Sequence, residues 1–501
     1  MSRDSAGDSS ESSERGAGAA AHPSDAAYLG GERPTRVRWT VFSLAFSTSW
    51  LLYLHRYLFS FIKPTLSKEW GLSNTELGQL DSAFSLSYTV FQFPLGVVGD
   101  VFGVHLVLSL MILLWCSGLG LLAWSSTARG LWYAQTLVGT GQSAVYACLT
   151  RVARTWFPPK SRTTMQGTVS ILAGRLGALS SSLVFSSLLL GVIGMPWRTA
   201  VGTLVALGAV QLVLFAVFFR NSPRQHPQVN DAEADLIEGA GETASGVGAG
   251  PSTRTQADSA AHASATHSPG ANSTSANSAM SAIANSESKP GWRQMLSSMS
   301  GRSVLSLSFL TVQSILSTFA DNIYANWIPQ FLSQVHKLQY KSMGVYASLP
   351  LLGGAVAGLL GGYLNDRCIA WSGNKRWSRA VVAIAGKGIA AAVLFAALTQ
   401  YERPYVFCGL LFFVKLFGDW SLVSMHGTVA DIGGRGTASL FAWLNTLAGI
   451  GMIAAPLVFG YVADHHGWWH VFMLVAVTYV LCALTWFGID CTRPVMDRLA
   501  K

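Results

Sequence analysis

Charged residues are scarce in this chain. Asp, Glu, Lys and Arg make up 12% of its 501 residues, against about 25% in soluble globular domains. Hydrophobic residues make up 50%, and the shortage of charge extends over long stretches of sequence. This distribution excludes a large soluble domain and indicates a protein embedded in a lipid bilayer.

The patterns of catalytic and metal sites are also missing. The six cysteines have no paired spacing and most fall inside apolar runs, so neither a disulfide framework nor a metal site is expected. The sequence has no P-loop and no Ser-His-Asp set outside the apolar stretches. His465 and His466 lie in a short loop and are interpreted as solvated. We expect no enzyme, no cofactor and no metal.

Long apolar runs are abundant. About twelve stretches reach the roughly 20 mostly apolar residues that a transmembrane helix needs. The first extends from about Trp39 to Ile62. Residues 1–30 lack the apolar core of a cleavable signal peptide, so this first span is expected to act as an uncleaved insertion signal.

Basic residues concentrate in alternate loops. Arg and Lys cluster before the first span and after the fourth, sixth, eighth and last, whereas the intervening loops carry isolated residues such as Arg129, Arg198 and Arg403. Cytoplasmic loops are the basic ones, which predicts an even number of spans with both termini in the cytoplasm of a bacterial-type inner membrane. The net charge of +9 is explained by this pattern, so no nucleic-acid partner is expected.

The spans form two sets of six. Residues 228–290 are dominated by Ser, Ala, Thr, Asn and Gly, a composition that cannot bury a core. We therefore predict five segments: a disordered cytoplasmic tail (1–35), a six-helix bundle (36–220), a largely disordered cytoplasmic loop (221–300), a second six-helix bundle (301–490) and a cytoplasmic tail (491–501). Asp366 and Arg435 repeat Asp100 and Arg162 at offsets of 266 and 273 residues, as a parallel duplication predicts.

The turn after the second span carries a known pattern. Gly96, Asp100 and Gly103 match the motif G-x-x-x-D-R-x-G-R-R of the major facilitator superfamily, and the turn after the eighth span keeps Gly362, Asp366 and Arg367. Val101, Val104 and His105 replace the basic residues of the first copy. The resemblance implies an all-α integral membrane fold with twelve transmembrane helices in two pseudo-symmetric bundles, and a cytoplasmic gate in which glycines allow close helix approach and Asp pairs across the half.

A narrower resemblance is to the anion:cation symporter family. Its motifs are similar to the segment Phe219–Glu233, to Trp156-Phe157-Pro158 followed by Arg162, to residues 91–96, and to Trp327-Ile328-Pro329. The resemblance implies a small organic anion as substrate, such as a sugar acid or hexuronate, with a proton as the usual coupling cation. We expect a lipid-embedded monomer.

One face of the first span is polar. Ser49, Tyr53, Arg56 and Ser60 follow helical spacing, and a guanidinium offers a planar fork for a carboxylate. The family resemblance implies that Arg56 binds the substrate carboxylate; a structural ion pair is the alternative. His55 stands where related symporters have a coupling Asp, and it could titrate near neutral pH or simply pack inside the bundle.

Further ionisable residues lie within other spans. Asp321 in the seventh is a candidate for coupling, or for pairing with Arg56 between turnovers. Lys415 and Asp419, four residues apart in the tenth span, could neutralise each other, although Asp419 is also a coupling candidate. Arg175, between Gly174 and Gly177 in the fifth, is interpreted equally as a second carboxylate ligand or as a structural or gate residue. The remaining candidates for lining a cavity are Tyr88, Gln142, Tyr146, Tyr324 and Asn445.

Two other functions remain open at this point. An organophosphate antiporter of the same superfamily would also have an arginine in the first span, but an acid, Asp321, stands where the pattern of those proteins has a further arginine. A transporter-like sensor could signal through the segment 221–300, which contains no recognisable output domain.

Overall fold

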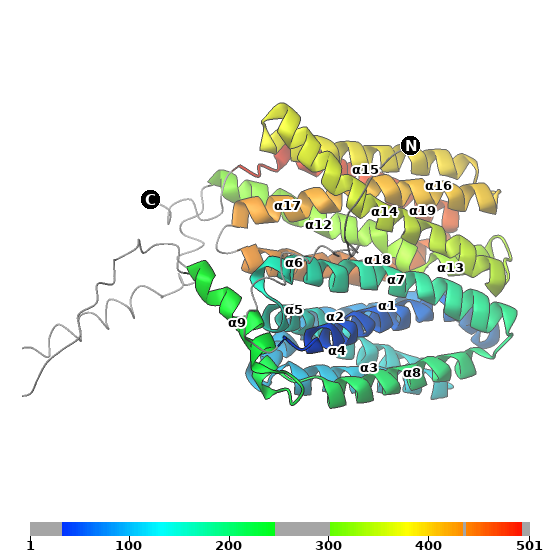
Figure 1. Cartoon of the computed structure of the whole chain (residues 1–501). Coiled ribbons are helices and arrows are strands. Elements are labelled where there is room, and N and C mark those ends of the chain that lie inside the picture. The colour runs from blue at the N-terminus through cyan, green and yellow to red at the C-terminus, as the bar shows by residue number, and fades with distance from the viewer. Residues whose placement is uncertain (1–32, 246–300, 434–436, 493–501) are drawn as a thin grey trace, which may run out of the picture.

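The computed structural model describes residues 33–245, 301–433 and 437–492. Within these ranges the chain is helical and has no strands. Figure 1 shows two bundles side by side with nearly parallel helices, the N-terminal one in blue to green and the C-terminal one in light green to red. Most of the two predicted tails (residues 1–32 and 493–501) and the segment 246–300 lie outside the described residues.

Six spans build the N-terminal bundle. They are α1 (Val37–Trp70), α2 (Asn74–Phe102), α3 (Val104–Trp124), α4 (Ala128–Gln142) with α5 (Val145–Trp156), the continuous run of α6 (Pro159–Gly167), η2 (Thr168–Leu172), α7 (Ala173–Ser180) and η3 (Ser181–Val192), and α8 (Trp197–Phe218). In the fifth span, η2 and η3 are π-helical and flank α7 on both sides.

Six more spans build the C-terminal bundle. They are α12 (Gly301–Asn326) with α13 (Ile328–Gln334), α14 (Tyr340–Ser372), α15 (Lys375–Thr399), α16 (Pro404–Gly418) with α17 (Trp420–Gly433), α18 (Thr437–His465) and α19 (Trp468–Thr485). The described residues therefore contain twelve spans in two sets of six, and the predicted fold class is confirmed.

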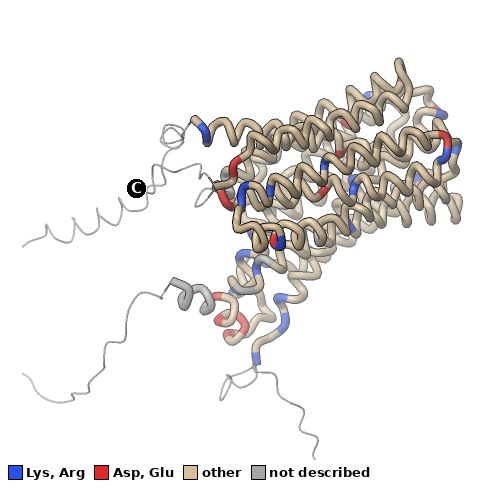
Figure 2. Tube along the Cα trace, turned by 90° about the horizontal axis from the view of Figure 1, so that it is seen from above, with Lys and Arg blue, Asp and Glu red and all other residues tan. Residues whose placement is uncertain are grey.

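Three of the twelve spans are more polar or more broken than the others. Nine described helices are long and apolar enough to cross a membrane; α1, α2 and the α4–α5 pair do not meet that criterion. Figure 2 shows that most of the length of the helices is uncharged and that only a few charged residues interrupt it. Intramembrane charge usually faces a bundle interior or a water-filled cavity, so α1 and α2 are the first places to look for a site.

Several spans are interrupted near their middle. The α4–α5 pair breaks after Gln142, α12–α13 breaks at Trp327, and α16–α17 breaks at Asp419. Non-helical backbone at membrane depth is tolerated where it is buried in protein or lines a cavity. The backbone N–H groups of Ser143, Trp327 and Asp419 at these breaks remain hydrogen-bonded to the carbonyls of Thr140, Ile323 and Lys415.

One end of the molecule carries several hydrogen bonds between the two bundles. The Asn74 Nδ2 atom donates to Asp464 Oδ1 at 2.8 Å, Ser82 Oγ donates to the Ile453 carbonyl at 2.9 Å, and Ser186 Oγ donates to a backbone carbonyl of α14 at 3.1 Å. A Cβ atom on Gly78 would collide with the Pro456 carbonyl, so glycine is needed there for α2 and α18 to approach. All these contacts lie near the end reached by the C-terminus of α1.

The opposite end carries an additional helix, α9 (Asp231–Ser245), and a short 3₁₀ turn, Pro223–Gln225. Both lie in the segment 221–300, for which the sequence predicts a largely disordered loop; its first part is instead helical. The buried Glu233 carboxylate accepts hydrogen bonds from the backbone N–H groups of Val37 and Arg38, both at 3.1 Å. Because α1 has no side-chain cap of its own, α9 supplies the anion that its N-terminus favours.

Candidate functional site

Arg56 lies at the middle of α1 in an aromatic enclosure. Its guanidinium carbon lies 5.2 Å from the ring centre of Tyr53, 5.4 Å from that of Phe84 and 4.7 Å from that of Tyr88. Its Nη2 atom is buried without a hydrogen-bond partner, and no carboxylate of the described residues forms an ion pair with it. A desolvated guanidinium without a counter-ion is costly, so the enclosure is suited to an anionic ligand.

Gln142 holds this arginine in place. The Arg56 Nε atom donates to Gln142 Oε1 at 3.0 Å, and the Gln142 amide donates in turn to the Leu52 carbonyl at 3.4 Å. Gln142 is fully buried at the end of α4, where the backbone changes direction. The sequence predicts that Gln142 lines the cavity; in the structure its amide oxygen contacts the Arg56 side chain.

Tyr146 completes the enclosure from α5. Its hydroxyl lies 3.0 Å from Ser49 Oγ, and its ring centre lies 6.1 Å from that of Tyr53. Gly174 of α7 leaves room for the Tyr53 ring, since a Cβ atom there would come within 2.9 Å of it. The predicted residues Tyr53, Tyr88 and Tyr146 therefore gather around Arg56.

His55 forms hydrogen bonds to two neighbouring helices, α3 and α8. It is buried in the N-terminal bundle, where Nδ1 accepts from Trp115 Nε1 at 3.2 Å and Nε2 lies 3.0 Å from the Leu204 carbonyl. Both ring nitrogens are used by a neutral imidazole in this arrangement. These hydrogen bonds pack the ring inside the bundle, and His55 also lines the cavity that Arg56 and Asp321 line.

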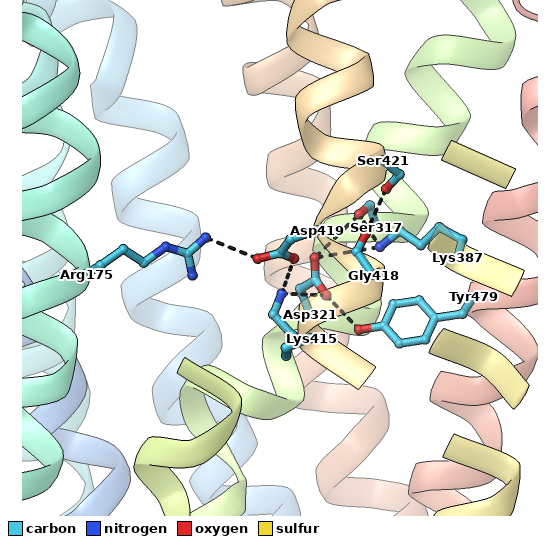
Figure 3. A network of polar contacts seen from close by, with 9 residues as sticks. All are labelled: Arg175, Ser317, Asp321, Lys387, Lys415, Gly418, Asp419, Ser421 and Tyr479. Atoms are coloured by element: carbon cyan, nitrogen blue, oxygen red, sulfur yellow. Dashed lines mark hydrogen bonds and ion pairs between the residues drawn. The ribbon is translucent and has the colours of Figure 1, made fainter. Parts of the chain in front are cut away.

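Five charged side chains form a network between the bundles (Figure 3). Lys415 Nζ lies 2.5 Å from Asp419 Oδ1 and 3.1 Å from Asp321 Oδ1. Arg175 Nη2, from the N-terminal bundle, donates to Asp419 Oδ2 at 3.1 Å. Lys387 Nζ lies 3.9 Å from Asp321 Oδ2. The predicted Lys415–Asp419 pair is present, but it is one link of a longer chain.

Sequence analysis offered an ion pair between Asp321 and Arg56 as one possibility. The two residues do not pair in this conformation. The Asp321 carboxylate accepts from the Tyr479 hydroxyl at 2.7 Å and from Ser317 Oγ at 3.4 Å, besides the two lysines. Tyr324, also predicted at the site, is buried with its ring centre 5.5 Å from Lys415 Nζ. Both residues belong to the network of the C-terminal bundle.

A cavity of about 270 Å³ is lined by residues of both bundles. Arg56 and Asp321, from different bundles, both line it. Sequence reasoning missed most of its lining residues, among them Tyr57, Asp81 and Phe84. The predicted Asn445, by contrast, is an exposed residue of α18, and no described contact connects it with Arg56 or with the network.

A second buried ion pair lies beside this cavity. Lys63 of α1 donates to the Asp81 carboxylate of α2 and to the Asn326 carbonyl of α12 at 2.9 Å. Its ammonium also lies 3.8 Å from the ring centre of Trp327. Lys63 thus ties the N-terminal bundle to the break between α12 and α13. Neither charged residue was a candidate from the sequence.

The turn motif is only partly as expected. Asp100 pairs with Arg151 of α5 at 2.9 Å, within one half. Gly103 has φ +86° and lies against Asn221, so a side chain there would be strained and crowded. Gly96 and Gly362 do not mark tight contacts: a Cβ atom would meet nothing closer than 3.8 Å at Gly96 and nothing within 4 Å at Gly362.

The second copy of the motif contributes less in this conformation. Arg367 lies with its guanidinium carbon 5.9 Å from the Tyr363 ring centre on the same helix, and Asp366 precedes it on α14. Neighbouring glycines lie in closer contact. A Cβ atom added to Gly361 would lie 3.3 Å from Trp420 and 3.2 Å from Val423, and one added to Gly99 of α2 would lie 3.2 Å from Cys148.

Comparison with known proteins agrees with this architecture. Residues 45–398 match the sequence profile of the Major Facilitator Superfamily. The chain belongs to that superfamily. This membership confirms the prediction of a multi-pass membrane transporter rather than an enzyme.

Similar curated relatives of this major facilitator are bacterial transporters. A probable sulfoacetate transporter of Cupriavidus necator is 26% identical over 83% of this chain and 85% of its own length. A probable galactarate/D-glucarate transporter of Bacillus subtilis is 24% identical, covering 87% of this chain and 88% of the relative. The hexuronate transporter of Escherichia coli K12 is 24% identical over 92% and 96% of the two chains.

Solved structures support the fold. An inward-facing bacterial homologue of the lysosomal transporter Spinster aligns with TM-score 0.65 and 14% identity over 91% of this chain and 97% of the other. A D-xylose–proton symporter aligns with TM-score 0.64 and 15% identity over 91% and 98%. At these identities the likeness concerns the fold.

Proposed function

We propose that this protein is a secondary transporter that carries an organic anion, such as a sugar acid, a hexuronate or another carboxylate, by alternating access. The observation that supports this most directly is the buried Arg56 guanidinium, which has aromatic walls, no carboxylate partner and a cavity in front of it. A carboxylate can accept two parallel hydrogen bonds from such a fork. The substrates named for the relatives, sulfoacetate, galactarate/D-glucarate and hexuronate, belong to the same class.

The coupling ion in this proposal is a proton, and Asp419 and Asp321 are the carboxylates that bind it. Asp419 holds Arg175 from the opposite bundle, so protonation of Asp419 would remove the charge that links the halves at this point. Protonation of Asp321 would change the charge beside Lys415 and Lys387. A proton can drive the transition because it binds the two conformations with different affinity.

The proposed location is the bacterial inner membrane, with both termini in the cytoplasm and a monomer as the working unit. Loops rich in Lys and Arg alternate as the positive-inside rule requires. In this orientation the contacts between Asn74 and Asp464, and between Ser82 and Ile453, lie on the periplasmic side. The conformation described here is then the inward-facing one.

Uptake into proteoliposomes tests the proposal. A panel of labelled organic acids would be offered to wild type, Arg56→Ala and Arg56→Lys, with and without an inward proton gradient. Arg224→Ala is the matched control, because Arg224 is an exposed arginine paired with Asp235 and Glu238 outside the spans. We expect gradient-driven uptake that Arg224→Ala retains and Arg56→Ala loses. Equal uptake by the Arg56→Ala protein would contradict the assigned role of this residue.

A further inference from the structure

We propose that the site selects organic dianions: one acid group of the substrate binds Arg56, and the second binds Arg175 in place of Asp419. This inference rests on the proposed function and narrows its substrate class. It follows from the way positive charge is distributed between the bundles and from the bonds that each charged group could exchange.

The first anionic position is Arg56. Its Nε is engaged by Gln142 at 3.0 Å, whereas its Nη2 is buried and has no partner. A single acid group satisfies this donor and supplies the missing counter-charge. The rings of Tyr53, Phe84 and Tyr88 lie 4.7–5.4 Å from the guanidinium carbon and lower the local polarity, which strengthens the electrostatic attraction of a bound anion.

The second position is Arg175. Its one described ion pair is with Asp419 Oδ2 at 3.1 Å, and its side chain is 30% exposed whereas that of Asp419 is 3% exposed. Asp419 keeps Lys415 as a partner at 2.5 Å when Arg175 leaves. The Arg175–Asp419 bond is therefore the exchangeable one, and an anionic group can take the place of Asp419 on the arginine.

The charges of the network leave room for a second anion. Arg175, Lys387 and Lys415 face two carboxylates, Asp321 and Asp419, in the arrangement of Figure 3. With these groups in their ordinary ionisation states, the network has one positive charge in excess. Arg56 adds a second uncompensated charge. Two negative charges on one substrate neutralise both, whereas a monoanion on Arg56 leaves the network with its one excess positive charge.

Tyr57 is a further polar residue of this region. It lines the same cavity as Arg56 and Asp321, and its ring centre lies 6.1 Å from that of Tyr53. A substrate that spans the two arginines therefore passes a neutral phenol able to donate and accept hydrogen bonds. This suits hydroxylated or short linkers between the two acid groups.

Matched ligand pairs give a direct test. Galactarate and galactonate differ by one carboxylate in place of one hydroxymethyl group, and sulfoacetate and isethionate differ in the same way. Dissociation constants would be measured by calorimetry on the purified full-length protein. The proteins compared are wild type, Arg175→Gln, Arg175→Lys and a control, Arg151→Gln. Arg151 pairs with Asp100 at the cytoplasmic end. Charge-assisted hydrogen bonds predict that wild type binds at least one dianion about 10- to 100-fold more tightly than its partner.

The variants then locate the second acid group. Arg175→Gln should weaken dianion binding and so reduce the ratio of monoanion to dianion dissociation constants to about threefold or less. Arg175→Lys should retain part of this ratio, and Arg151→Gln should leave it unchanged. A wild-type ratio near one, or a ratio that persists in a folded Arg175→Gln protein, overturns the dianion inference. If monoanions bind in an Arg56-dependent way in that case, the proposed function stands. If neither pair binds to folded wild type, both proposals fail.

Discussion

The contribution of the buried Lys63–Asp81 pair to the stability of the protein can be predicted quantitatively. The side chains of Lys63 and Asp81 are 0% and 6% exposed. Removing one partner of a buried ion pair costs about 3–5 kcal/mol because the other charge remains without compensation. After Asp81→Leu, Lys63 retains the Asn326 carbonyl and the Trp327 ring, so we expect a loss near the lower end, about 3 kcal/mol.

Thermal unfolding in detergent, followed by tryptophan fluorescence, measures this loss. For soluble domains of 150–250 residues, 1 kcal/mol corresponds to about 2–4 °C, so Asp81→Leu should lower the apparent melting temperature by roughly 6–12 °C. The double variant Lys63→Met/Asp81→Leu removes both charges and should recover most of the difference, because apolar replacement of a buried pair is often neutral or stabilising.

An exposed carboxylate is the control for this experiment. Asp235 pairs with Arg224 at 2.8 Å, and the two side chains are 68% and 52% exposed. Exposed pairs contribute about 0–1 kcal/mol, so Asp235→Asn should melt close to wild type. If Asp81→Leu melts like Asp235→Asn, or if the double variant is no more stable than the single one, the pair does not hold the bundles as argued.

Three further predictions follow from other contacts. Arg56→Lys keeps the charge but loses the planar fork and the bond to Gln142, so initial uptake should fall at least about tenfold; unchanged uptake would show that charge alone suffices. Gly103→Ala, at φ +86° against Asn221, should cost about 1–3 kcal/mol in thermal unfolding, whereas Gly362→Ala should be neutral. Glu233→Gln should lose about 1 kcal/mol by weakening the cap of α1, seen as faster proteolysis near residue 231; equal cleavage rates would contradict this.

The spans and the central arginine were predictable because they depend on local sequence. Apolar runs of sufficient length indicate helices whatever their neighbours are, and an arginine inside such a run has few interpretations besides function or pairing. Arg56, Asp321 and the tyrosines of α1, α2 and α5 could therefore be found without a structure.

Lys63 and Asp81 were missed for a structural reason. The expected first span ended at Ile62, but α1 continues through Pro64 to Trp70, so Lys63 lies inside the helix rather than in a loop. Its acceptors, Asp81 and the Asn326 carbonyl, come from two other helices. Such a pair is defined by tertiary packing, which no spacing in one segment reveals.

The direction of His55 illustrates the same limit. Helical periodicity places His55 next to Arg56 but about 100° away around the helix, and only the packing of α3 and α8 shows that it is enclosed by Trp115 and Leu204. The helix α9 was also not expected, because the low-complexity composition that follows it dominates the segment.

The π-helical stretches of the fifth span have a mechanical consequence for Arg175. This residue sits in an eight-residue α-helical piece, Ala173–Ser180, with wider turns on both sides. A π turn holds about one residue more than an α turn, so converting one such turn to α geometry rotates everything beyond it by roughly 100°. The span can therefore swing its guanidinium from one bundle toward the other as a torsional step, without bending and without breaking more than a turn of backbone hydrogen bonds.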